Sequence, residues 1–248
     1  MFILILLAMA GANGLMHLEM LGILDDAAWY GQYAMMYLVL LLIVVMGGRV
    51  IPFFTERGVA GVRTRSWRGI EWLAGSSIVL LLLAELLFDD AVAIGTALLA
   101  FTVHFIRLVG WYDRRIWRVP LVWVLQLGYA WLVLALGLAV LAHLGMIPLA
   151  WAWHAFTVGG IGGITLGMMA RVTLGHTGRE MRLPRGMVSA FVLIFLAAGL
   201  RVLGPLLLPD AYPAWLAWAG IVWILAFGIF LVFYVPMLLR PRVDGRPG

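Results

Sequence analysis

The sequence predicts an all-α protein that crosses a membrane about eight times. Hydrophobic residues make up 65% of the 248 residues and charged residues only 12%, whereas a soluble domain is about half apolar and a quarter charged. The apolar residues form long runs, and a helix needs about 20 of them to cross the hydrocarbon core. Charged residues gather between these runs. Together these observations favour one membrane domain over residues 1–248 and exclude a soluble protein.

Eight runs are long enough to cross the membrane. The first is interpreted as a retained helix and not a signal peptide, because no basic segment precedes it and the apolar run continues past the candidate cleavage point. The expected spans cover residues 1–22, 31–54, 70–88, 91–111, 119–146, 149–175, 187–208 and 213–239.

The charges in the connecting loops predict the orientation of the spans. The loops after the second, fourth and sixth spans carry arginines, as does the tail, and the loops after the first, third and seventh carry aspartates and no arginine. Arginine-rich loops stay in the cytoplasm, so both termini are expected there. In a membrane protein such arginines indicate topology, and no nucleic-acid partner is expected.

The five histidines are the candidate metal ligands, because the chain has no cysteine and thiolate sites are therefore excluded. His17, His143 and His154 fall at the outer ends of their spans. Glu19 lies at the same level as His17. Imidazole and carboxylate ligands suit copper, iron or zinc. The sequence therefore predicts an outer metal site, although an interfacial structural role explains each histidine singly about as well.

An inner layer contains His104 and His176 with three arginines, Arg49, Arg107 and Arg171. Two histidines on different helices can ligate a haem, and arginines can hold its propionates through charge-assisted hydrogen bonds. The alternative is that Arg49 and Arg107 extend to the cytoplasmic interface without binding anything.

The sixth span is the most informative segment of the chain. His154 and His176 are about 33 Å apart by helical rise and cannot share a metal. At 100° per residue, Met169 lies on the same face as these two histidines. The opposite face carries glycines at a spacing of four residues, where a helix or a flat ligand can approach the backbone closely. The glycines are Gly159, Gly163 and Gly167.

Three motifs resemble the NnrS family. The block from His154 to Arg179, with Met169-Ala-Arg-Val-Thr-Leu-Gly-His176-Thr-Gly at its end, closely resembles the family signature. The segment Gly47-Gly48-Arg49-Val50-Ile51-Pro52-Phe53-Phe54-Thr55 is similar to the family element GGRxIPxFT. A shorter likeness covers Asn13 to His17-Leu18.

The resemblance implies a haem and copper protein of the bacterial inner membrane, linked to nitric oxide exposure and denitrification. His17, His154, His176, Arg49 and Arg171 fall on matching positions, and the implied cofactors are b-type haem and copper. Nitric oxide or an iron-nitrosyl species is the implied partner. Family members usually have more spans, so we expect a shortened or fragmentary member that resembles the middle and C-terminal part. An electron donor or the absent helices would then be further partners.

Two other functions fit the same residues. In a metal or haem permease, the histidines would form a transport path instead of a fixed site. In an enzyme, the same cofactors would turn over nitric oxide. The sequence does not choose between enzyme and non-enzyme.

Overall fold

The computed structural model describes residues 2–245, and within that range the chain forms helices and no strand. All eight expected spans are present, with ends displaced by a few residues. The helices are α1 (Phe2–Met20), α2 (Ala27–Gly58), α3 (Arg68–Leu87), α4 (Asp90–Trp111), η1 (Arg114–Arg118), α5 (Pro120–His143), α6 (Leu149–His154), η2 (Ala155–Ile161), α7 (Gly162–His176), α8 (Met187–Val202), α9 (Gly204–Leu207), η3 (Pro209–Ala211) and α10 (Tyr212–Leu238).

The helix ends follow local chemistry. Asp89 accepts a hydrogen bond from the Val92 amide and caps the start of α4, as short polar residues do at this position. Pro120 begins α5, where its missing N–H costs nothing. After α7 the chain turns through Gly178, whose φ of 72° suits glycine.

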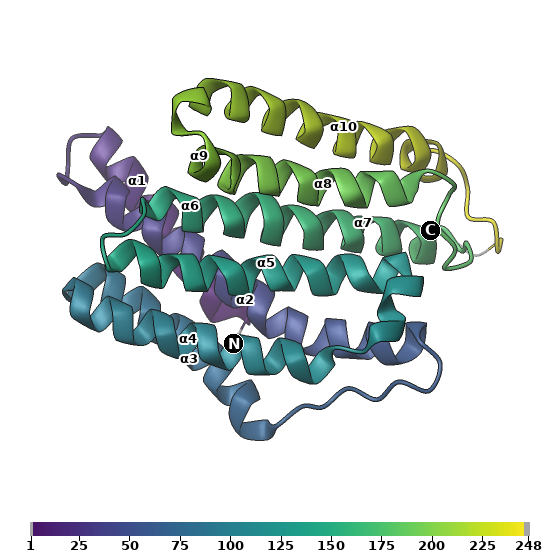
Figure 1. The fold of residues 1–248 in the computed structure, drawn as a ribbon, viewed down its shortest axis with the longest axis horizontal. Coiled ribbons are helices and arrows are strands. Elements are labelled where there is room, and N and C mark those ends of the chain that lie inside the picture. The colour runs from purple at the N-terminus through teal and green to yellow at the C-terminus, as the bar shows by residue number, and fades with distance from the viewer. Residues whose placement is uncertain (1, 246–248) are drawn as a thin grey trace.

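The charged loops separate to opposite ends of the molecule. The loops after α4 and α7 lie at the right of Figure 1, and the loop after α2 starts at the right and runs back below the molecule to α3. The loops that carry aspartates lie at the left. This is the arrangement that the charge pattern predicts for a polytopic helical membrane protein.

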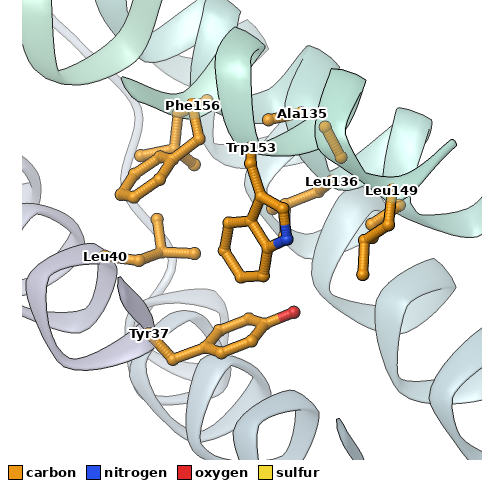
Figure 2. A pocket seen from close by; sticks show the side chains of 10 residues that line it. Tyr37, Leu40, Ala135, Leu136, Leu149, Trp153 and Phe156 are labelled. Carbon is orange, nitrogen blue, oxygen red and sulfur yellow. The ribbon is translucent and has the colours of Figure 1, made fainter. Parts of the chain in front are cut away.

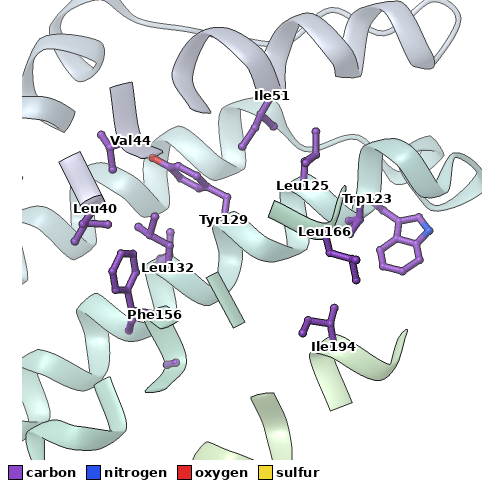
Figure 3. Packing of buried hydrophobic residues seen from close by; sticks show 14 of the residues in the cluster. Leu40, Val44, Ile51, Trp123, Leu125, Tyr129, Leu132, Phe156, Leu166 and Ile194 are labelled. Carbon is purple, nitrogen blue, oxygen red and sulfur yellow. The ribbon is translucent and has the colours of Figure 1, made fainter. Parts of the chain in front are cut away.

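The long α5 helix forms the centre of the molecule (Figure 1). It packs against α2 and α4 on one side and against η2 and α7 on the other, and α8 and α10 continue the layer beyond α7. In Figure 3, Leu125, Tyr129 and Leu132 of α5 lie between the α2 side chains and those of the sixth span. Tyr129 is fully buried, like Leu132.

The glycines of the sixth span bring it close to α5. A Cβ added at Gly159 would lie 2.4 Å from the Trp131 ring, and one at Gly167 would lie 2.6 Å from Val124. Gly128 of α5 faces Gly163, since a Cβ at Gly163 would lie 3.3 Å from the Gly128 Cα. This surface therefore serves helix packing, one of the two alternatives that the spacing of four allows.

Gly31 permits a similar close approach between α1 and α2. A Cβ at this position would lie 2.5 Å from the Ala12 carbonyl oxygen, which is a backbone atom and cannot rotate away. We expect Gly31→Val to separate α1 from α2 and make the loop at residues 21–26 more sensitive to protease in detergent. Gly14→Val is the control, because nothing lies within 4 Å of its added Cβ. Equal cleavage of the two variants would contradict this expectation.

Candidate functional site

Four polar side chains from three helices form a buried inner cluster. Arg107 of α4 pairs with Glu71 of α3, and its Nε donates to Glu71 Oε1 at 3.0 Å. Arg107 Nη1 donates to the Val44 carbonyl and to the Tyr129 hydroxyl, both at 2.9 Å. The Tyr129 hydroxyl lies 2.6 Å from His104 Nδ1. The cluster therefore connects the inner end of α3 with a histidine that is 0% exposed.

The hydrogen bonds determine which nitrogen of His104 carries the proton. A guanidinium can only donate, so the Tyr129 oxygen accepts from Arg107 and its own hydrogen points to His104 Nδ1. A neutral His104 then carries its hydrogen on Nε2, and the Ala74 backbone is the hydrogen-bond partner of this imidazole besides Tyr129. Neither His104 nitrogen presents a free lone pair to a metal in this arrangement.

The paired glycines of the GGRxIPxFT element make room for this cluster. A Cβ at Gly48 would lie 1.7 Å from Arg107 Nη2, and one at Gly47 would lie 3.6 Å from the Tyr129 ring. The element thus places α2 backbone directly against the Arg107 guanidinium. Arg49, the next residue, is exposed and lies outside the cluster.

The end of the same element contacts the sixth-span motif. The Arg171 guanidinium lies 3.9 Å from the centre of the Phe54 ring, a cation–π contact. Arg171 Nη2 also donates to the Leu121 carbonyl at 3.0 Å. The two motifs that carry the family resemblance therefore meet inside the molecule, and Arg171 is buried there.

An outer cluster lies at the opposite ends of the same helices. His143 Nε2 is 2.9 Å from Glu85 Oε1, and His143 Nδ1 is 3.0 Å from Asp90 Oδ1. The Tyr37 hydroxyl donates to Glu85 at 2.7 Å. The Glu85 side chain is only 4% exposed, so the imidazole and the hydroxyl are its main partners.

The two clusters are linked by a regular spacing. Fourteen residues separate Glu71 from Glu85 on α3, Asp90 from His104 on α4, and Tyr129 from His143 on α5. By helical rise this spacing is about 21 Å. Each of these three helices thus contributes at least one polar residue to each cluster, and α4 contributes both His104 and Arg107 to the inner one.

His154 forms a separate contact with α8. Arg201 Nη2 lies 2.6 Å from His154 Nε2 and donates to the Tyr212 hydroxyl at 3.1 Å. Because the arginine can only donate, this histidine nitrogen accepts and is not free for a metal. The expected common face of His154 and His176 does not form, because residues Ala155–Ile161 adopt a π-helix. The wider turn changes the angle per residue and rotates His154 relative to α7.

The remaining candidates lie on the surface. His17 and Glu19 are exposed at the end of α1, and Glu19 accepts a hydrogen bond from the Ala28 amide. His176 and Met169 are exposed on α7. These two are seven residues apart, about 10.5 Å by helical rise.

The fold therefore does not bring together the residues of the predicted haem site or those of the predicted outer metal site. His104 and His176 lie on opposite sides of α5, and α7 packs on α5, α8 and α10. The outer residues His17, His143 and His154 lie in three different places. Over residues 2–245, no three His, Asp or Glu side chains form a group that could hold a metal ion.

The interior has little room beside these histidines. The pocket in Figure 2 lies between α2, α5 and the sixth span, is lined by Tyr37, Trp153 and apolar side chains, and has a volume of about 20 Å³. That is space for about one water molecule. A larger cavity of about 300 Å³ lies between α4, η1 and α5. No histidine lines either one.

Several functional candidates were not assigned from the sequence. Glu85 falls at the outer level of the candidate ligands in the sequence, but Glu71 and Tyr129 were not proposed as members of a site. Gln126 was not singled out. The spacing of fourteen residues on α3, α4 and α5 is a signal in the sequence that indicates the two clusters.

Within residues 2–245, eight membrane-length helices around two polar clusters define a polytopic helical membrane protein. The family model described as "NnrS protein" matches residues 1–242. The chain belongs to the NnrS family. The match extends over nearly the whole chain and gives the expectation of a fragmentary member no support. No curated protein and no solved structure matches this chain.

Proposed function

We propose that this chain is a haem-binding protein of the bacterial inner membrane that acts in the response to nitric oxide, with copper as a second metal. Membership of the NnrS family supports the link to nitric oxide. The observation that supports haem binding best is the exposed imidazole of His176, the one inner-layer histidine whose side chain is open to a ligand.

A haem enclosed between His104 and His176 does not fit one chain. His104 is fully buried, its Nδ1 accepts from Tyr129, and it lines neither of the two cavities described above. The exposed His176 is the histidine through which this chain would ligate a haem on the α7 surface. Arg179, which follows in the chain, would pair with a propionate, whereas Arg242 donates to the His176 carbonyl at 2.8 Å and is already paired with Asp244.

Haem bound through one histidine would offer an open coordination position to nitric oxide. The chain itself supplies the imidazole at the cytoplasmic end of α7. It also supplies arginine side chains for the carboxylates of the haem. The buried Arg171 fixes α7 against α2. A second protein surface would complete the site.

The outer cluster does not hold copper by itself. Both His143 nitrogens contact carboxylates, and over residues 2–245 no three His, Asp or Glu side chains form a group that could hold a metal ion. Copper on this chain would therefore need a further donor from outside it. The permease alternative gains no support from the structure, since neither cavity is lined by a histidine.

The deciding experiment is a reduced-minus-oxidised visible spectrum of the purified full chain, with and without nitric oxide, together with metal analysis. We expect bands that shift with nitric oxide in the wild type and in His104→Gln, and a loss of most of the haem in His176→Ala. Haem retained by His176→Ala but lost from His104→Gln would place the ligand in the buried cluster. A colourless wild-type protein would reject haem binding.

A further inference from the structure

Arg201 lies at the outer end of α8, at the opposite end of the chain's spans from the other arginines. In the sequence those arginines fall in the loops and tail at the inner end, or in the inner halves of their spans. They follow the rule that keeps cations on the cytoplasmic side, and Arg201 does not. Topology therefore does not explain this arginine, and a charged side chain inside a span usually marks a functional site.

The partners of Arg201 are all neutral. Its Nη2 lies 2.6 Å from His154 Nε2 and donates to the Tyr212 hydroxyl at 3.1 Å. The guanidinium also lies 5.4 Å from the centre of the Tyr212 ring. Asp210 is the acidic residue nearest in the sequence, but no carboxylate of residues 2–245 forms an ion pair with Arg201. Over that part of the chain, its positive charge has no counter-ion.

The connection between α8 and α10 is folded so that Tyr212 reaches Arg201. A Cβ added at Gly204 would lie 2.5 Å from the Trp215 ring, so this ring packs directly on the backbone at the start of α9. Trp215 Nε1 also donates to the Leu208 carbonyl at 3.1 Å. These contacts hold the beginning of α10 against the end of α8, at the left of Figure 1.

Several donors at this site have no acceptor. Arg201 Nε and Nη1 donate to nothing within residues 2–245. The Tyr212 hydroxyl accepts from Arg201, and its own hydrogen has no acceptor over the same range. A ligand can reach these groups, because Arg201 is only half-buried and Tyr212 is 43% exposed. Guanidinium and hydroxyl donors around one positive charge suit an oxyanion.

We propose that Arg201 and Tyr212 bind a singly charged oxyanion, and that His154 positions the guanidinium by accepting from it. One guanidinium balances one negative charge, and hydrogen bonds between charged groups are the strong ones. Two sources have this chemistry, the phosphodiester of an outer-leaflet phospholipid and the monoanion of inorganic phosphate. The exposed side chains of Leu203 and Leu207 would contact the acyl chains of the lipid. The site is independent of the haem proposal and gives His154 a role that needs no metal.

The test measures hydrogen exchange by mass spectrometry on the full chain in dodecyl maltoside. The exchange is read in residues 203–216, which include Tyr212 and lie away from the arginine-rich end. The probes are dihexanoylphosphatidylglycerol for the lipid and inorganic phosphate for the free anion, and dihexanoylglycerol is the control that lacks a phosphate. We expect dihexanoylphosphatidylglycerol to slow exchange in this segment and dihexanoylglycerol to leave it unchanged. Slowing by inorganic phosphate would identify the free anion as a sufficient ligand.

Two variants connect the effect to the proposed donors. In Arg201→Gln, the probe concentration for half the effect should rise at least about tenfold, because the charged donor is lost. In Tyr212→Phe, which keeps the ring, it should rise about fivefold. Arg185→Gln is the matched control, since Arg185 is exposed just before the other end of α8 and carries the same charge. It should respond like the wild type.

Three results would overturn the proposal. They are no slowing of exchange by either phosphate probe, equal slowing by dihexanoylglycerol, and an unchanged response in Arg201→Gln. If Arg201→Gln does not fold, Tyr212→Phe decides in its place, because it removes a single hydroxyl from an exposed side chain. A response of Tyr212→Phe equal to that of the wild type would then reject the site.

Discussion

Replacing Arg107 by methionine is expected to lower the free energy of unfolding by about 3 kcal/mol. Arg107 is 3% exposed and gives hydrogen bonds to Glu71, Val44 and Tyr129. Without the guanidinium, the buried Val44 carbonyl and Tyr129 hydroxyl lose a donor, and the Glu71 carboxylate, whose side chain is 30% exposed, loses its partner. Removing one partner of a buried ion pair costs far more than the pair itself contributes.

The midpoint of heat inactivation in detergent, read by size-exclusion chromatography, measures this loss. The double variant Arg107→Met with Glu71→Gln should be more stable than Arg107→Met alone, because no charge is left unpaired. Arg115→Met is the control for an exposed pair. Arg115 lies outside the spans and holds the pKa of Asp113 at about 2, but exposed pairs contribute little. Equal midpoints for Arg107→Met and Arg115→Met would contradict the prediction.

Gly48→Ala is expected to destabilise the wild type by a similar amount, about 3 kcal/mol, and to change sign in the Arg107→Met background. The added methyl would lie 1.7 Å from Arg107 Nη2, so the guanidinium must leave Glu71. Methionine ends before that position and removes the closest contacts. The remaining close contact, 2.9 Å to Glu71 Oε2, is with the end of a side chain that no longer has an arginine partner and can rotate away. Alanine then gains about 0.5–1 kcal/mol over glycine in a helix interior.

The same heat series tests this reversal. Gly95→Ala in α4 is the matched control, because nothing lies within 4 Å of its added Cβ, and it should be neutral or stabilising in both backgrounds. If the stability losses of Gly48→Ala and Arg107→Met add in the double variant, the glycine is not needed to make room for the guanidinium.

The spans were predictable because each depends on local composition. The length of an apolar run, its composition and the arginines in the adjacent loops can be read without knowing which helices pack together. All eight helices lie near the expected residues. The paired glycines of the GGRxIPxFT element were visible, but their purpose was not. It depends on Arg107, which is about sixty residues further along the chain.

The grouping of histidines by depth could not predict their contacts. The depth of a residue along the membrane normal does not give its position within the membrane plane. His104 and His176 lie at a similar depth but are not close to each other. The common face of His154 and His176 was predicted from a constant 100° per residue. The π-helix at Ala155–Ile161 breaks that assumption, and no local residue type predicts it clearly.

The spacing of fourteen residues between the inner and outer clusters has a mechanical consequence. Each of α3, α4 and α5 is joined to its neighbours at two depths. The inner cluster does so through Glu71, His104 and Tyr129, and the outer cluster through Glu85, Asp90 and His143. A helix held at two depths cannot slide along its axis without breaking both sets of bonds. A bilayer that is too thin or too thick must therefore deform around these helices, because the helices themselves cannot shift to match it.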